Sequence, residues 1–214
     1  MLAYPYKAPS RLWQWLPMLG VLAASCSAAR GPVGMNQEWR QLEVVDSAGG
    51  YSAGELSAVF VRVPAAEGYG PERPYGADIE VRAAEGQLHL ECEAQEGAYR
   101  CLLDGSVFFS IDARCERGEL ASGASVLPWY EGELLRGYTV RQDEGTRAAF
   151  QLDRRPRVAF LDAATPETSE RELALAAILL SDLLAQNAER AFMCDGVIGA
   201  HLRALEASGA DGAP

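Results

Sequence analysis

Hydrophobic and polar residues alternate with a period of two along most of the chain between residues 39 and 163. The alternation is clearest at 59–63 (VFVRV), 79–82 (IEVR), 88–93 (LHLECE), 150–152 (FQL) and 158–160 (VAF). Gly-, Pro- and Asp-rich stretches separate these runs at spacings of about ten residues, which is typical of antiparallel sandwiches and barrels. The pattern therefore predicts a mainly β domain at 39–163.

One hairpin can be predicted in detail, because Glu96-Gly97 is a turn signal between two of the runs. With these two residues as the loop, Cys92 faces Cys101 at a non-hydrogen-bonded pair. The Cα atoms of such a pair are close enough for a disulfide. The same register places Leu90 beside Leu103 on the cysteine face. We therefore predict a Cys92–Cys101 disulfide.

The next turn signal, Asp104-Gly105, conflicts with the pattern around it. A two-residue loop at this point would oppose Arg100 to Phe109, a charged residue to an apolar one. Either the loop is longer, or the strand at 107–112 crosses to a second sheet. The second alternative fits a sandwich.

From residue 164 the pattern becomes helical and continues to 208, followed by a polar tail at 209–214 that we expect to be disordered. Thr165 and Pro166 offer an N-cap and a proline at the first helical position. The run at 173–180 (LALAAILL) is apolar on every face, so we expect it to be buried. Gly196 is expected to break the helix. Cys194, at this break, is assigned by elimination to a disulfide with Cys115.

Charge and cysteine content narrow the class of protein. Removing residues 1–25 leaves 17 basic and 30 acidic residues, a formal charge of −13. So acidic a domain is unsuited to nucleic acid, because phosphate binding depends on Lys and Arg. Cys92, Cys101, Cys115 and Cys194 have no zinc-site spacing and are expected to form two disulfides in an oxidising compartment. No metal or other cofactor is expected.

Residues 1–25 are predicted to be a signal peptide, with Lys7 and Arg11 before an apolar stretch at 12–24. The segment LAASC (22–26) resembles the lipobox of bacterial lipoproteins, although Ala23 stands where leucine is commoner. The resemblance implies lipidation of Cys26, an anchor in the lipid bilayer, and an outer-membrane location facing the periplasm or the cell surface. Residues 26–38 would then be a flexible tether. An ordinary secretory signal cleaved nearby is the alternative.

The stretch at 56–113 resembles bacterial Ig-like domains. It carries a valine strand (SAVFVRV, 57–63), a Gly/Pro turn leading into GADIEV (76–81), and DGSVFFSIDA (104–113). The resemblance covers about a quarter of the chain and implies an antiparallel Ig-like sandwich. The expected fold is therefore such a sandwich with a C-terminal helical appendage at 164–208. A shared fold of this kind implies no particular site.

Candidate chemistry is sparse. Gly50–Gly54 (GYSAG) fits G-x-S-x-G, the nucleophile elbow of serine hydrolases, with Ser52 as nucleophile. The residues after it read as a strand and not a helix, and the possible bases, His89 and His201, are both expected at the surface. Acidic pairs on strands could be glycosidase acids or calcium ligands, but such pairs most often form a solvated face. Trp129 and Tyr130 form a candidate aromatic binding site, or else close one end of the sandwich.

These observations favour a non-enzymatic, membrane-anchored accessory or binding protein that contacts another envelope protein. A serine hydrolase using Ser52 is the alternative, and an acidic metal- or carbohydrate-binding module is a third hypothesis.

Overall fold

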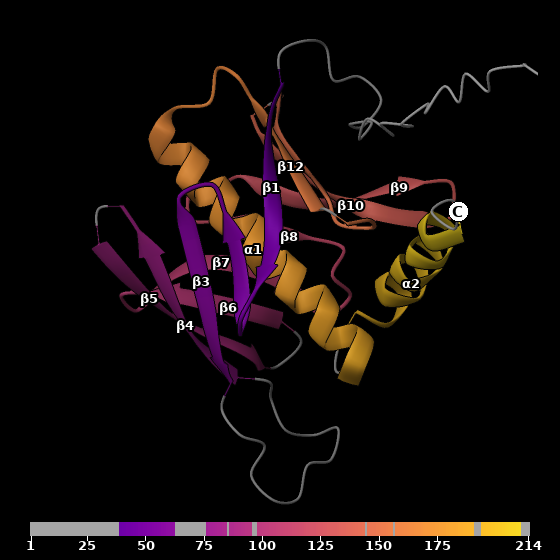
Figure 1. Ribbon diagram of the computed structural model, residues 1–214, viewed down its shortest axis with the longest axis horizontal. Helices are drawn as coiled ribbons and strands as arrows, with labels where there is room; N and C mark the ends of the chain where they lie inside the picture. Colours follow the sequence, from indigo (N-terminus) through magenta and orange to yellow (C-terminus); the bar gives the residue numbers. More distant parts are fainter. Residues whose placement is uncertain are drawn as a thin grey trace, which may run out of the picture.

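The computed structural model describes residues 39–62, 76–84, 86–95, 98–143, 145–155, 157–190 and 194–210. These residues form twelve strands and two helices (Figure 1). The strands are β1 Trp39–Ser47, β2 Gly50–Ala53, β3 Leu56–Arg62, β4 Gly76–Ala83, β5 Gly86–Gln95, β6 Ala98–Leu103, β7 Ser106–Asp112, β8 Gly118–Leu120, β9 Ser125–Glu131, β10 Leu134–Gln142, β11 Gly145–Gln151 and β12 Arg157–Asp162. The helices are α1 Glu167–Arg190 and α2 Asp195–Ala210. The expected signal peptide, Cys26, the tether and residues 211–214 lie outside the described residues.

The strands form one closed antiparallel barrel in which each strand pairs with its neighbours in sequence. The first and last strands also pair, from Trp39 opposite Asp162 to Val44 opposite Arg157. The prediction of an Ig-like sandwich was therefore wrong. A sandwich needs two separate sheets, whereas here every strand has a partner on both sides and no edge is left unpaired.

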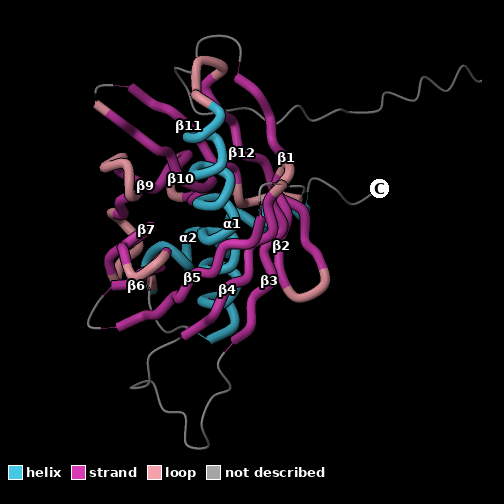
Figure 2. The backbone as a smooth tube through the Cα atoms, turned by 90° about the vertical axis from the view of Figure 1, so that its left-hand side faces the viewer, coloured by secondary structure: helices cyan, strands magenta, loops and turns pink. Residues whose placement is uncertain are grey.

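Helix α1 runs through the inside of the barrel and is not an appendage. Figure 2 shows it between the wall that holds β1–β3 and the wall that holds β6–β10. Every residue from Leu173 to Leu184 is buried, on all faces of the helix. About eight strands enclose just enough space for side chains, so a twelve-stranded barrel has room for more. The expected burial of 173–180 is confirmed, and α1 supplies much of the core that the strands surround.

The two rims of the barrel differ because α1 begins at one and ends near the other. The proximal rim contains the start of β1, the end of β12, the β2–β3 turn at 54–55 and Ala84 after β4. The distal rim contains the β7–β8 connection at 113–117 and residues 152–155 after β11. At the proximal rim, the Ser122 amide donates to Glu172 of α1 at 3.0 Å.

At the distal rim, α2 follows α1 and packs against β10 and the end of α1. The expected break of the helix at Gly196 is misplaced, since α2 already begins at Asp195. The Cys115–Cys194 disulfide joins the start of α2 to the β7–β8 connection, with Cα atoms 5.0 Å apart. The amide of Cys194 also donates to the carbonyl of Ala113 at 2.7 Å. This predicted disulfide is confirmed.

The β5–β6 hairpin has the predicted register. Cys92 lies opposite Cys101 and Leu90 opposite Leu103. The Cys92–Cys101 disulfide is present, with Cα atoms 4.0 Å apart. The loop residues Glu96 and Gly97 lie outside the described residues, but Gln95 pairs with Ala98 as a two-residue loop requires.

The pattern around the Asp104-Gly105 turn is explained by a β-bulge, which is neither of the two alternatives expected from the sequence. The turn has two residues, both with positive φ (51° and 75°), as a type I′ turn requires. The register then shifts between Cys101 and Leu102, which adds one residue to β7. As a result Phe109 faces Cys101 inside the barrel, and Arg100 faces Ser110 outside. The strand stays in the same sheet.

Candidate functional site

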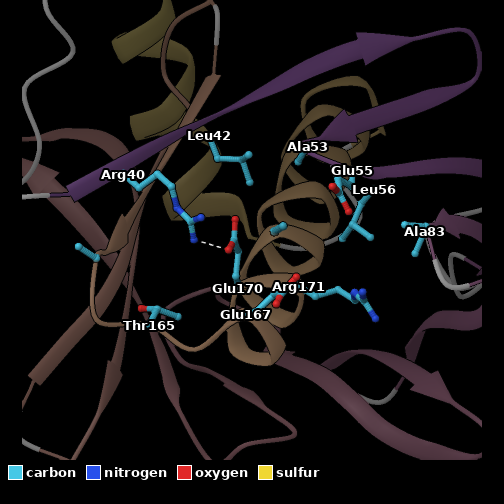
Figure 3. Close-up of a pocket in the computed structure, with 14 residues that line it drawn as sticks. Arg40, Leu42, Ala53, Glu55, Leu56, Ala83, Thr165, Glu167, Glu170 and Arg171 are labelled. Carbon is cyan, nitrogen blue, oxygen red and sulfur yellow. Dashed lines mark hydrogen bonds and ion pairs between the residues drawn. The ribbon is translucent and has the colours of Figure 1, made fainter.

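An open pocket of about 510 Å³ lies at the proximal rim and is here called the proximal pocket. It lies where α1 enters the barrel (Figure 3). Its walls come from β1, the β2–β3 and β4–β5 turns, the segment after β12, and the first turns of α1. The lining residues are Arg40, Leu42, Ala53, Gly54, Glu55, Leu56, Ala83, Ala84, Ala163, Thr165, Glu167, Glu170, Arg171 and Ala174.

Small side chains create this pocket. Strands β2 and β4 both end in alanine at this rim, at Ala53 and Ala83, and Ala163 follows β12. Gly54 contributes as well, because its φ of +58° suits glycine and a Cβ there would come within 2.9 Å of Leu42. The floor is apolar and buried, with Leu56 and Ala174 among its residues. The pocket therefore combines an apolar floor with a rim open to solvent.

Charged side chains line the opening. Arg40 on β1 forms an ion pair with Glu170 on α1, and Figure 3 shows the two side chains directed toward each other. Arg171 extends to the other side of Glu170 in the same view. Glu167 and Glu170 also lie in the first turn of α1, where acids stabilise the helix dipole. With Glu55, the opening carries three acids and two arginines, a slight negative excess that favours a basic or neutral group.

One polar atom of the pocket is left without a partner. The Thr165 hydroxyl is buried and has no hydrogen bond to any described residue. Leaving a buried hydroxyl unpaired costs about 1–3 kcal/mol. A ligand group that bonds to Thr165 would remove this cost. The arrangement is suited to holding a short polar chain over an apolar floor.

The GYSAG segment forms a strand and a turn, not a nucleophile elbow. Ser52 lies within β2, between Val45 of β1 and Ser57 of β3. The structure explains why both positions are glycine. Gly50 approaches the backbone of Ala58 too closely for a Cβ, and Gly54 has a positive φ in the β2–β3 turn. The β2–β3 hairpin therefore accounts for both glycines of the motif.

Among the described residues neither histidine is placed to activate Ser52. His89 is exposed on β5, and three strand spacings separate β5 from β2, roughly 14 Å. His201 is on α2 at the distal rim and is only 5% exposed. The expectation that His201 lies at the surface was wrong, because α2 packs its histidine side against the barrel and α1.

Trp129 and Tyr130 lie on β9 near the distal rim, away from the proximal pocket. Tyr130 is 42% exposed, and burial together with the negative charge of Glu116 raises the pKa of its hydroxyl. Trp129 is partly buried and lies opposite Gly137 of β10. Neither residue of this pair lines the proximal pocket.

The distal rim holds a partly buried ionic cluster that the sequence pattern did not reveal. Asp153, fully buried, accepts a hydrogen bond from Arg136 at 2.7 Å, and Arg136 also donates to Glu131 at 2.8 Å. Burial lowers the pKa of the Arg136 guanidinium, but the hydrogen bonds and charges of its two carboxylate partners raise it further, and the net shift is upward. Ser208 of α2 donates to the Asp153 carbonyl at 2.8 Å. The cluster ties α2 to the barrel.

Cys26, the expected lipidation site, lies outside the described residues. Within the part of the chain that the structure describes, no helix is long and apolar enough to cross a membrane. No three His, Cys, Asp or Glu side chains come together as metal ligands among the same residues.

Comparison of the chain with protein-family models, with curated proteins and with solved structures finds no match.

Proposed function

We propose that this protein is an exported, membrane-anchored binding module that holds a segment of another envelope protein in the proximal pocket. The observation that carries the proposal is the pocket itself, about 510 Å³ and lined from several elements at one rim of a barrel. A site of this size accommodates a few residues of a partner.

The filled interior supports binding at a rim. In barrels that carry small apolar molecules the ligand lies inside. Here α1 occupies that space, and its residues from Leu173 to Leu184 are buried on all sides. Among the described residues, the inside of the barrel therefore has no space for a ligand, whereas the proximal pocket is open to a partner segment.

Charge supports a basic partner segment. The chain after residue 25 has a formal charge of −13, and the opening of the pocket has an acidic excess of one. Complementary charge speeds association and suppresses wrong partners. A loop or tail that carries one Lys or Arg beside small residues fits both the acids of the opening and the apolar floor.

The membrane anchor rests on the lipobox-like sequence before Cys26. Metabolic labelling with palmitate tests it: label is expected on the wild-type protein and on a Ser27→Ala control, and not on Cys26→Ala. A soluble, unlabelled wild-type protein in the periplasm would overturn the anchor and leave export standing.

Site-specific photocrosslinking in cells that make the protein tests the binding site. A photoreactive residue at Ala84, which lines the pocket, is expected to crosslink one envelope protein. The same residue at Ala121, exposed on the β8–β9 turn of the same rim, is the matched control. Ala163→Trp narrows the pocket and is expected to abolish the crosslink from position 84. Equal crosslinking from both positions, or no effect of Ala163→Trp, would contradict the proposal.

A further inference from the structure

A second cavity, at the distal rim, has a different chemistry from the proximal pocket. It has a volume of about 220 Å³ and lies between the β11–β12 connection, the second half of α1, and α2. We call it the arginine pocket, because Arg154, Arg155 and Arg157 line it together with His201. Three closely spaced arginines are unusual in a chain whose charge after residue 25 is −13.

The nearby acids do not neutralise all of this positive charge. Arg155 and Arg157 share one carboxylate, Asp46, at 3.4 and 2.5 Å. Arg154 approaches the buried carboxylate of Asp153 only to 3.9 Å, and its Nε has no hydrogen-bond partner among the described residues. Three arginines thus face two carboxylates. Adding Arg136 and Glu131, which complete the Asp153 cluster, leaves the same excess of one positive charge.

His201 provides an independent sign of a ligand. Its side chain is 5% exposed, it lines the arginine pocket, and its Nδ1 has no hydrogen-bond partner among the described residues. Buried polar atoms in folded proteins are almost always paired with protein groups, water or ligand. An unpaired imidazole nitrogen and the unpaired Nε–H of Arg154, on two residues that line the same cavity, therefore mark a place where a polar group of a ligand belongs.

The rest of the wall is mainly apolar. Leu184, Ala185 and Ala188 of α1 lie on one side, and Leu152 and Leu205 lie on the other elements. Ser181 of α1 completes the lining, and its hydroxyl donates to the Ala177 carbonyl of its own helix. A bare inorganic anion would leave this wall in contact with water, whereas an anion with a short hydrocarbon chain would cover it. The volume lies below that of sites for drug-sized ligands, so the cavity suits a small molecule.

We propose that the arginine pocket binds a small organic monocarboxylate, with its carboxylate on Arg154 and His201 and its hydrocarbon chain against Leu184 and Leu205. The carboxylate would accept a hydrogen bond from the unused Nε–H of Arg154 and balance the single excess positive charge. This site lies at the opposite rim from the proximal pocket and shares no lining residue with it. A test of this site is therefore independent of the proposed function.

Pentanoate, with seven non-hydrogen atoms, is the probe, and pentanamide is its uncharged analogue of the same shape. The chain contains only two histidines, so imidazole NMR signals of the full protein are assigned with a single His89→Gln variant. Millimolar pentanoate is expected to shift the His201 signals saturably and to leave those of His89, exposed on β5, unmoved.

Two variants test the contacts. Arg154→Gln is expected to weaken pentanoate binding about tenfold, which is the loss of one charge-assisted hydrogen bond. Leu205→Trp, at a partly exposed position, fills the pocket without crowding the core and is expected to abolish the shift. Arg203→Gln, exposed on the same helix and outside the pocket lining, is the control and is expected to bind as the wild type does.

A His201 shift that is equal with pentanamide, or equal with inorganic phosphate, would overturn the assignment to an organic carboxylate. No shift at millimolar pentanoate, or an unchanged shift in Leu205→Trp, would overturn the site itself.

Discussion

At the scale of single residues, the buried His201 has the clearest consequence. Burial lowers the pKa of its imidazole to about 4, with a smaller lowering by Arg157 and an opposing effect of Asp153. The ordinary value is 6.5, so the unfolded chain takes up the proton before the folded protein does. The stabilisation from the neutral imidazole is therefore complete above pH 6.5 and is lost as the pH falls toward 4.

We predict that lowering the pH across this window reduces the free energy of unfolding of the wild type by up to about 3 kcal/mol more than that of His201→Gln. Urea unfolding at several pH values measures the free energy of unfolding of both proteins. Subtracting one from the other cancels the contribution of the carboxylates, which both proteins share. His89→Gln is the control and should follow the wild type. Parallel curves for the wild type and His201→Gln would contradict a buried neutral histidine.

Gly137 is a second residue at which a substitution is expected to change stability strongly. It lies in β10 so close to the Phe150 carbonyl of β11 that a Cβ would overlap it. We predict that Gly137→Ala destabilises the protein by about 3 kcal/mol, the scale of overpacking in a core. Gly145→Ala, in the same hairpin, meets only the Gln142 carbonyl at 3.9 Å and should be nearly neutral. Thermal unfolding of the two variants compares them; an equal loss would contradict the close approach.

At the scale of elements, the two disulfides differ in the length of chain that they close. Cys92–Cys101 spans a separation of 9 residues and Cys115–Cys194 spans 79. All four cysteines are buried, so replacing either pair with alanine leaves cavities of similar size. The difference between the two paired variants therefore reflects mainly the loop entropy of the unfolded chain.

We predict that the Cys115→Ala/Cys194→Ala variant loses roughly 2 kcal/mol more stability than Cys92→Ala/Cys101→Ala. Denaturant unfolding without reductant measures both. A smaller loss for the long loop would show that α2 is held at the distal rim mainly by packing and by the Ser208–Asp153 hydrogen bond.

Local features of the elements were predictable from the sequence, and the pairing of strands far apart in the sequence was not. The β5–β6 register follows from two adjacent runs and one turn, and Cys92 faces Cys101 as predicted. The bulge after Cys101 was missed, although the clash between Arg100 and Phe109 had marked the place. A two-residue turn and an outward Arg100 are compatible only if β7 has one extra residue.

The barrel and the proximal pocket were missed for one shared reason. A period of two says which face of a strand is buried, but it does not say whether β1 pairs with β12, more than a hundred residues away. Without that pairing, Ala53, Ala83 and Ala163 are alanines at unrelated strand ends, whereas closure brings them to one rim. The sequence did contain a sign of the barrel: the run at 173–180 is apolar on every face, and a helix lying on a sandwich would need a polar face toward solvent.

At the scale of the whole molecule, α1 makes the barrel and the helices a single folding unit. Side chains of the strands, of α1 and of α2 belong to one hydrophobic core. The interior is thereby closed to ligands, and the two rims carry the cavities, with an acidic excess at the proximal opening and a basic one at the distal cavity. The proposed binding sites depend on this arrangement, because α1 lines both.

Hydrogen exchange of the α1 amides in the full-length protein tests this arrangement most directly. If α1 lies inside the barrel, the amides from Leu173 to Leu184 open only when the barrel unfolds, and their exchange should match the slowest amides of β10–β12. Exchange of these helix amides by an independent, lower-energy opening, while the strands stay protected, would mean that the helix is an appendage and would contradict the account.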